Sequence, residues 1–154
     1  MKTYSRLTLA FLLLIFFVPL VVADDPPKNG PYVEYYENGN KKSEANYKNG
    51  EQDGLWTGWH ENGQKWQEGH YKNGKKEGLW TGWYSNGERR YEAHFKNGKQ
   101  EGLVTLWYKN GQKESESHWT NGKQDGLATW WDEDGNKTKE VQYKDGKEIS
   151  RKEF

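Results

Sequence analysis

The sequence contains no cysteine, and that absence excludes two kinds of structure. No disulfide framework can hold the fold together, and no lipid-modified cysteine can anchor the chain. An excess of one charge is also lacking, because 23 basic side chains are balanced by 23 acidic ones. Nucleic-acid binding calls for a basic patch or stripe, so the charge balance gives no reason to expect nucleic acid as a partner.

Aliphatic side chains are scarce after residue 23, and charged residues make up 30% of the chain. Nine tryptophans and ten tyrosines supply most of the remaining apolar surface. A large core enclosed between two layers needs more apolar material than this. We therefore expect one extended sheet and not a sandwich.

The one long apolar run lies at the start of the chain and has the features of a secretory signal peptide. Lys2 and Arg6 precede an apolar stretch that ends in Val21-Val22-Ala23, a small-residue cleavage pattern. We expect residues 1–23 to be removed near Ala23 and the protein to be exported, to the periplasm or the cell exterior. Retention of the run as a membrane anchor is the alternative, because about 20 apolar residues span a bilayer. Without the two leader cations the net charge is −2, from 21 basic and 23 acidic side chains.

A 24-residue period begins after a short polar linker, residues 24–29, and runs through residues 30–154. Self-similarity at a fixed spacing indicates a repeat architecture, in which each unit buries its apolar surface against its neighbours. Five units open with a glycine and carry an aromatic residue at their sixth position. The glycines are Gly30, Gly54, Gly78, Gly102 and Gly126, and the aromatic residues are Tyr35, Trp59, Trp83, Trp107 and Trp131.

Each unit holds two turn signals eleven residues apart. Asn-Gly and Asp-Gly are the preferred pairs of type I′ hairpin turns. The first series starts at residues 38, 62, 86, 110 and 134, and the second at residues 49, 73, 97, 121 and 145. We expect type I′ turns throughout and two strands per unit. The predicted fold is an all-β, elongated, single-layer, twisted antiparallel meander of about ten strands.

The alternation of side chains along a strand assigns residues to the two faces of this sheet, provided that both turns are two-residue loops. In the third unit one face then carries Trp80, Gly82, Tyr84, Arg89, Tyr91, Ala93 and Phe95. The other carries Leu79, Thr81, Trp83, Arg90, Glu92 and His94. Small residues beside the rings of the first face indicate packing. One extra residue in a turn would exchange parts of the two lists.

The third unit reads GLWTGWYSNGERRYEAHFKNGKQE and resembles the bacterial variant of the MORN repeat. The resemblance covers nearly all of the chain after the leader. It implies a β-meander that serves as a scaffold for protein partners or, in some cases, for lipid head groups. Bacterial proteins with this variant repeat are often described as antitoxin-like, and the resemblance brings no catalytic motif with it.

No metal, cofactor or catalytic site is expected. His70, His94 and His118 occupy one repeat position, but equivalent positions lie two strands apart, roughly 9.5 Å. Zinc is bound at about 2.0–2.1 Å, so two such histidines cannot share an ion. There is no Ser-His-Asp set with supporting context and no phosphate-binding glycine loop, so we expect no enzymatic activity.

The function that the sequence favours is binding of a protein partner by an exported, non-catalytic scaffold. The expected binding residues form the aromatic row Tyr35, Trp59, Trp83, Trp107 and Trp131. Cross-strand packing is the structural alternative for this row. A glycan or choline-type ligand at the cell surface, a lipid head group, and an antitoxin or immunity-like role remain open as functional alternatives.

Overall fold

The computed structural model describes residues 25–154, so the predicted signal peptide lies outside the described part of the chain. From residue 25 onward every regular element is a β-strand. This part of the chain offers no helix with the length and apolarity needed to cross a bilayer.

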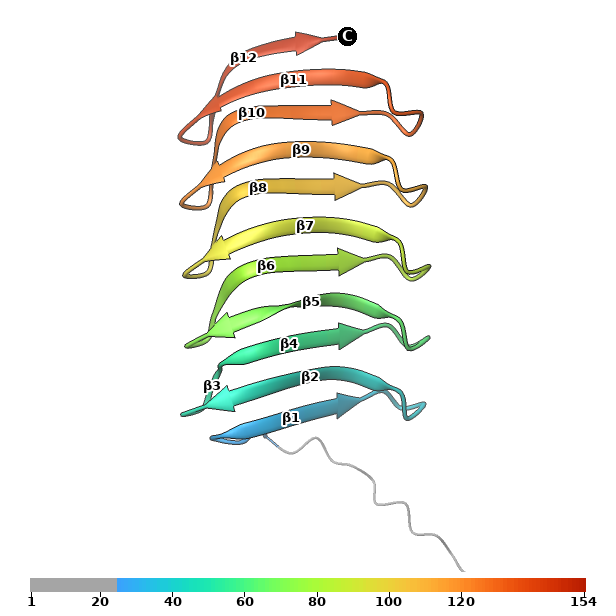
Figure 1. The fold of residues 1–154 in the computed structure, drawn as a ribbon, viewed down its shortest axis with the longest axis vertical. Helices are drawn as coiled ribbons and strands as arrows, with labels where there is room; N and C mark the ends of the chain where they lie inside the picture. Colours follow the sequence, from blue (N-terminus) through green and yellow to red (C-terminus); the bar gives the residue numbers. More distant parts are fainter. Residues whose placement is uncertain (1–24) are drawn as a thin grey trace, which may run out of the picture.

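One open antiparallel sheet contains all the strands, in an order that follows the chain (Figure 1). The strands are β1 (Gly30–Tyr35), β2 (Lys41–Lys48), β3 (Glu51–Gln52), β4 (Gly54–Trp59), β5 (Lys65–Lys72), β6 (Lys75–Trp83), β7 (Arg89–Lys96), β8 (Lys99–Trp107), β9 (Lys113–Thr120), β10 (Lys123–Trp131), β11 (Lys137–Lys144) and β12 (Lys147–Glu153). The short β3 pairs with β2, and together β3 and β4 occupy the repeat positions that β6 covers as one strand. The predicted single-layer meander with two strands per unit is confirmed, and β12 begins a partial sixth unit.

Two different turns join the strands, one kind along each edge of the sheet. The second series consists of type I′ turns: Lys96 pairs with Lys99, and both Asn97 (φ 52°) and Gly98 (φ 80°) have positive φ. That part of the prediction is right. For the first series the prediction of type I′ turns is wrong, as the third unit shows.

In the third unit the first-series loop holds three residues, 85–87. The N–H of Gly87 donates to the carbonyl of Tyr84, and the N–H of Tyr84 donates to the carbonyl of Glu88. Within this loop only Gly87 has positive φ, which is the pattern of a type I turn followed by a glycine bulge. The side chain of Asn86 accepts the N–H of Glu88 at 3.1 Å, so asparagine serves here as a hydrogen-bond acceptor.

Because the loop has one residue more than expected, Arg89 and Arg90 lie on the faces opposite to those predicted. The pairing of β6 with β7 shifts after Gly82, so Trp83 lies opposite Arg89. Arg89 therefore shares the face of Trp83 and forms an ion pair with Glu92 at 3.0 Å. Arg90 lies on the opposite face, where it lines a cavity together with Tyr91. The expectation had these two residues exchanged.

The repeat glycines Gly78, Gly102 and Gly126 lie within strands β6, β8 and β10 and mark a bend in each. β6 pairs with β5 before Gly78 and again at Thr81 and Gly82, and from Gly78 onward it also pairs with β7. Gly78 has a φ of 71°, a conformation that strains any residue with a Cβ. Figure 1 shows the bend in β6, β8 and β10, close to the type I′ turns.

One side of the sheet carries most of the buried rings, and we call it the ring face. Its central residue, Trp80, is fully buried and stacks on Trp56 with ring centroids 5.8 Å apart. The edges of Tyr71 and Phe95 meet Trp80 at 5.0 and 6.3 Å. Gly69 leaves the space for Trp80, because a Cβ there would lie 2.2 Å from its ring. The predicted role of small residues beside the rings is confirmed.

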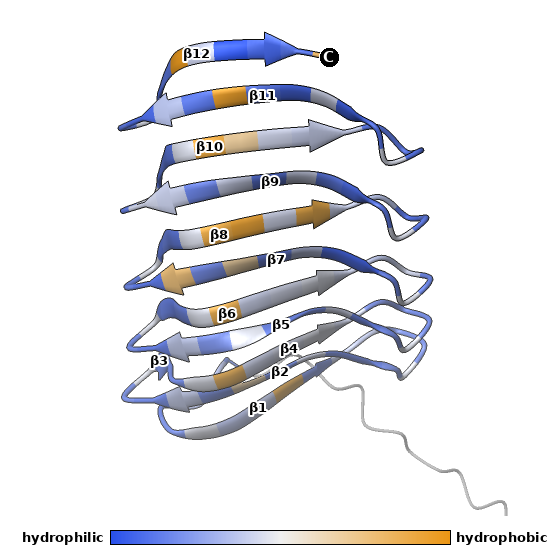
Figure 2. Ribbon diagram, turned by 45° about the horizontal axis from the view of Figure 1, so that its top comes forward, coloured by the Kyte–Doolittle hydropathy of each residue, from blue (hydrophilic) through white to orange (hydrophobic). Residues whose placement is uncertain are grey.

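Hydrogen bonds tie each turn to the next unit. The hydroxyl of Tyr84 donates to the carbonyl of Trp107 at 2.8 Å, and Tyr36 does the same two units earlier and Tyr108 one unit later. At the opposite edge, Glu77 accepts the N–H of Asn97 at 2.8 Å. Figure 2 shows that both turn-bearing edges are hydrophilic, so apolar residues are confined to the strands.

Candidate binding surface

The five predicted binding residues lie in one row on the side of the sheet opposite the ring face, which we call the ladder face. Each residue ends its strand, and each pairs with a basic residue on the following strand because of the bulge in the loop between them. The pairs are Tyr35 with Lys41, Trp59 with Lys65, Trp83 with Arg89, Trp107 with Lys113, and Trp131 with Lys137. The structure thus brings the predicted residues together as a ladder in which aromatic and cationic side chains alternate.

Cations lie close to the rings of this row at two places. The Nζ of Lys41 is 5.0 Å from the ring centre of Trp59, and the Nζ of Lys113 is 5.6 Å from that of Trp131. A cation within about 6 Å of an aromatic ring is attracted by the ring's quadrupole. The four tryptophans are half-buried and Tyr35 is 54% exposed, so the row combines fixed rings with access to solvent.

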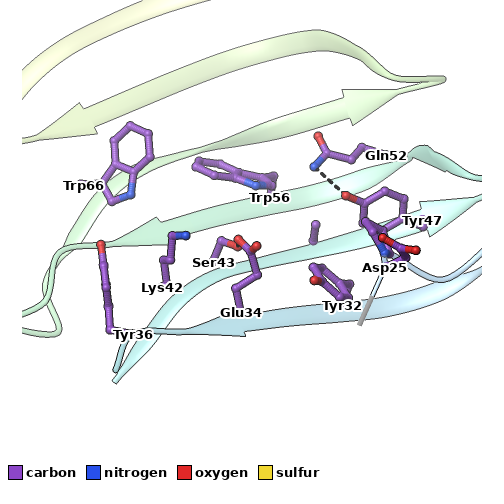
Figure 3. A pocket seen from close by; sticks show the side chains of 12 residues that line it. Asp25, Tyr32, Glu34, Tyr36, Lys42, Ser43, Tyr47, Gln52, Trp56 and Trp66 are labelled. Atoms are coloured by element: carbon purple, nitrogen blue, oxygen red, sulfur yellow. Dashed lines mark hydrogen bonds between the residues drawn. The ribbon is translucent and has the colours of Figure 1, made fainter. Parts of the chain in front are cut away.

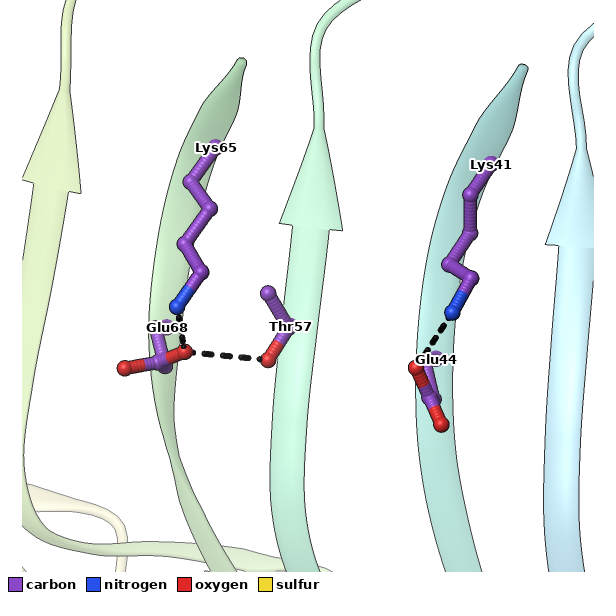
Figure 4. A network of polar contacts seen from close by, with 5 residues as sticks. All are labelled: Lys41, Glu44, Thr57, Lys65 and Glu68. Atoms are coloured by element: carbon purple, nitrogen blue, oxygen red, sulfur yellow. Dashed lines mark hydrogen bonds and ion pairs between the residues drawn. The ribbon is translucent and has the colours of Figure 1, made fainter. Parts of the chain in front are cut away.

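A row of glutamates matches these cations in number. Each glutamate lies three residues after its basic partner, within ion-pairing distance. Figure 4 shows two of the pairs, Lys41 with Glu44 at 2.7 Å and Lys65 with Glu68, whose carboxylate also accepts the hydroxyl of Thr57. The other pairs are Arg89 with Glu92, Lys113 with Glu116 and Lys137 with Glu140. Exposed ion pairs of this kind contribute little stability, about 0–1 kcal/mol each. Their main consequence is that each cation of the row has a carboxylate beside it.

The ladder face also presents a row of leucines that sequence reasoning did not include among the binding residues. Leu55, Leu79, Leu103 and Leu127 are 38–45% exposed. The first three lie opposite His70, His94 and His118. The sequence could have predicted this row, because each leucine follows a repeat glycine and lies on the same face as the tryptophan four residues later.

His70, His94 and His118 lie along the sheet at one repeat position, in three successive units. Within residues 25–154, no three His, Cys, Asp or Glu side chains come close enough to hold a metal ion.

The ring face has different chemistry, because its titratable groups lie against aromatic surface. The Nζ of Lys76 is 3.9 Å from the ring centre of Trp80, and partial burial lowers the pKa of this lysine. Burial likewise raises the pKa of Tyr71 and of Tyr91, whose hydroxyl accepts a hydrogen bond from Gln67. Two open cavities, of about 480 and 340 Å³, lie on this face.

The repeat can also be compared with known families. Five consecutive stretches match the family model of the MORN repeat variant, over residues 28–49, 52–73, 76–97, 100–121 and 124–145. The chain belongs to the MORN repeat variant family. Each MORN match begins two residues before a repeat glycine, and β12 follows the last one. A comparison with curated protein sequences gave no match.

Proposed function

We propose that this MORN repeat protein is a non-catalytic scaffold that captures a protein partner on its ladder face. The row of four tryptophans, one per unit with a cation opposite each, carries the proposal. Binding energy at protein interfaces is concentrated in a few Trp, Tyr and Arg residues. This row supplies such residues at a regular spacing on a hydrogen-bonded sheet.

The exposed leucine row adds apolar area beside the tryptophans. Leucines at 38–45% exposure, repeated in four successive units, form a larger apolar surface than isolated residues do. The glutamate and threonine rows separate the two apolar rows, because Thr81 and Glu92 pair between Leu79 and Trp83. A partner with two apolar ridges and polar groups between them would be complementary to this face.

Charge on the ladder face favours a protein over an anionic surface. Every cation of the row is paired with a glutamate, so little positive charge is left to attract anionic lipid head groups or nucleic acid. An antitoxin or immunity-like role would be one form of protein capture by this face.

Export forms part of the proposal and rests on the leader sequence alone. The charged start, the apolar run and the pattern ending at Ala23 support secretion with cleavage before Asp24. The intact mass of the protein recovered outside the cytoplasm is expected to be that of a chain starting at Asp24. A recovered chain that still starts at Met1 would contradict cleavage.

The binding proposal is tested by removing two central rings of the row. The partner is first isolated from the envelope fraction of the producing cell with the wild-type protein as bait. The double variant Trp83→Ala/Trp107→Ala should then bind that partner at least about tenfold more weakly, or about 1.4 kcal/mol. Central units are chosen because end strands also cap the array.

The matched control removes two rings from the ring face. Trp119 and Trp130 are also half-buried, but they lie on the other side of the sheet. The variant Trp119→Ala/Trp130→Ala should keep full affinity, and both double variants should keep the wild-type circular dichroism. If only the ring-face variant lost affinity, the partner would bind the ring face, and our proposal would be wrong.

A further inference from the structure

The larger cavity of the ring face lies in the first two units and is walled by aromatic rings. It has a volume of about 480 Å³, within the range of small-molecule sites. Five rings line it: Tyr32, Tyr36, Tyr47, Trp56 and Trp66 (Figure 3). They come from strands β1, β2, β4 and β5 and from the loop after β1, so the sheet itself fixes most of the wall.

Two lining residues of the first unit differ from their equivalents in the second unit. Ser43 stands at the position that Gln67 and Tyr91 fill in the next two units. Lys42, whose equivalent in the next unit is Trp66, also replaces a ring. The side chains of Ser43 and Lys42 are smaller or more flexible than Gln67 and Trp66, and both line the cavity.

A carboxylate replaces small or apolar residues in this cavity. Glu34 occupies the repeat position that is glycine at 58 and 82, leucine at 106 and tryptophan at 130. Its Oε2 accepts a hydrogen bond from the hydroxyl of Ser43 at 2.7 Å. Figure 3 shows the carboxylate among the cavity side chains, next to Ser43. Across residues 25–154, no basic side chain lies within ion-pairing distance of Glu34, although Lys42 lines the same cavity.

Elsewhere on the ring face, tryptophans already hold cations from the chain itself. The Nζ of Lys76 lies 3.9 Å from the ring centre of Trp80, and the Nζ of Lys139 lies 4.0 Å from that of Trp130. At Trp56 the position equivalent to Lys76 is taken by Gln52, which donates instead to the hydroxyl of Tyr47 at 3.2 Å.

No lysine or arginine in the described chain lies over Trp56 at cation–π distance. Trp56 thus occupies the repeat position of Trp80 but lacks the cation that Trp80 has.

We infer that this cavity binds a small organic cation of the quaternary ammonium class, with its methylated nitrogen against Trp56 and Glu34 as counter-ion. Aromatic rings attract such a cation through their quadrupoles, and a quaternary nitrogen has no N–H groups that require hydrogen-bond acceptors. Five rings and an unpaired carboxylate suit this ligand. The site is on the ring face, so it is independent of protein capture by the ladder face.

Calorimetric titration of the purified protein with choline chloride tests the inference. The probe should bind with a saturable heat, and 3,3-dimethyl-1-butanol, its uncharged carbon isostere, should bind at least about tenfold more weakly. Glu34→Gln should weaken choline binding at least about tenfold, because the carboxylate is the counter-ion. Glu44→Gln, an acid-to-amide change on the ladder face of the adjacent strand, should leave choline affinity unchanged.

Two further measurements keep the test decisive. Trp66→Leu removes a 38% exposed ring of the cavity wall and should also weaken choline binding while the circular dichroism stays at wild type. Lys42→Met removes the cavity's own cation and should bind choline at least as tightly as wild type. Equal affinity for choline and its uncharged isostere would overturn the inference. So would binding of neutral chitotriose without binding of choline, or unchanged affinity in folded Glu34→Gln.

Discussion

The contact between Trp80 and Gly69 illustrates how single residues allow a one-layer sheet to have a core. Trp80 is fully buried although the sheet has no second layer to cover it. Its neighbours on the ring face enclose it, and Gly69 on the adjacent strand lets its indole lie against the backbone. The indole N–H also donates to the carbonyl of His70 at 3.2 Å, which fixes the ring's orientation.

Gly69→Ala is expected to destabilise the protein by about 1–3 kcal/mol, the usual cost of overpacking a core. The added Cβ would lie 2.2 Å from the Trp80 ring, so the ring or the strand has to move. Urea unfolding monitored by circular dichroism measures the change. His70→Ala, on the same strand but with an exposed side chain on the ladder face, should change the free energy of unfolding by no more than about 0.5 kcal/mol. Equal losses in the two variants would contradict the packing of Trp80 on Gly69.

At this scale the sequence shows which residues are small and which are rings, and it therefore predicts that glycine accommodates a ring. It does not show that Lys76 lies over Trp80 while Gln52, at the equivalent position, bonds to Tyr47. The contacts of Lys76 and Gln52 depend on which neighbouring side chains are close to them in space, and the repeat pattern of the sequence does not show those distances. The cavity beside Glu34 is unpredicted for the same reason.

Among the elements, the turns show where the repeat pattern is ambiguous. Asn-Gly occurs at both edges. In the two-residue turn both Asn97 and Gly98 have positive φ, whereas in the three-residue loop Gly87 has positive φ and Asn86 does not. Asparagine suits both turns, because it tolerates positive φ and its side chain also accepts a nearby backbone N–H. The sequence therefore predicts hairpins at the right places but leaves the number of loop residues open.

That one residue decides which of two adjacent arginines shares a face with the tryptophans. Because the loop holds three residues, Arg89 pairs with Trp83 and Arg90 lies on the ring face. The tryptophan row itself was predictable, because it lies before the loop and its parity does not depend on the turn. Residues at the start of the next strand were not, because the bulge reverses their parity.

Across the whole molecule, the sheet separates two kinds of chemistry onto its two faces. The ladder face is an ordered surface of tryptophan, charge-paired lysine or arginine, and exposed leucine that repeats along the array. The ring face encloses a partial core and two cavities, and its residues vary from unit to unit. Regular repetition suits an extended protein partner, whereas local variation suits a small ligand.

The central claim, that a protein partner lies on the ladder face, is tested most directly by photocrosslinking from the adjacent positions 89 and 90. Both side chains are exposed, but Arg89 lies beside Trp83 on the ladder face and Arg90 lies on the ring face. A benzoylphenylalanine is placed at either position, and the isolated partner is added before irradiation. We predict a covalent adduct with the partner from position 89 and none, or at most a trace, from position 90. An adduct from position 90 alone would contradict the account, because the partner would then lie on the ring face.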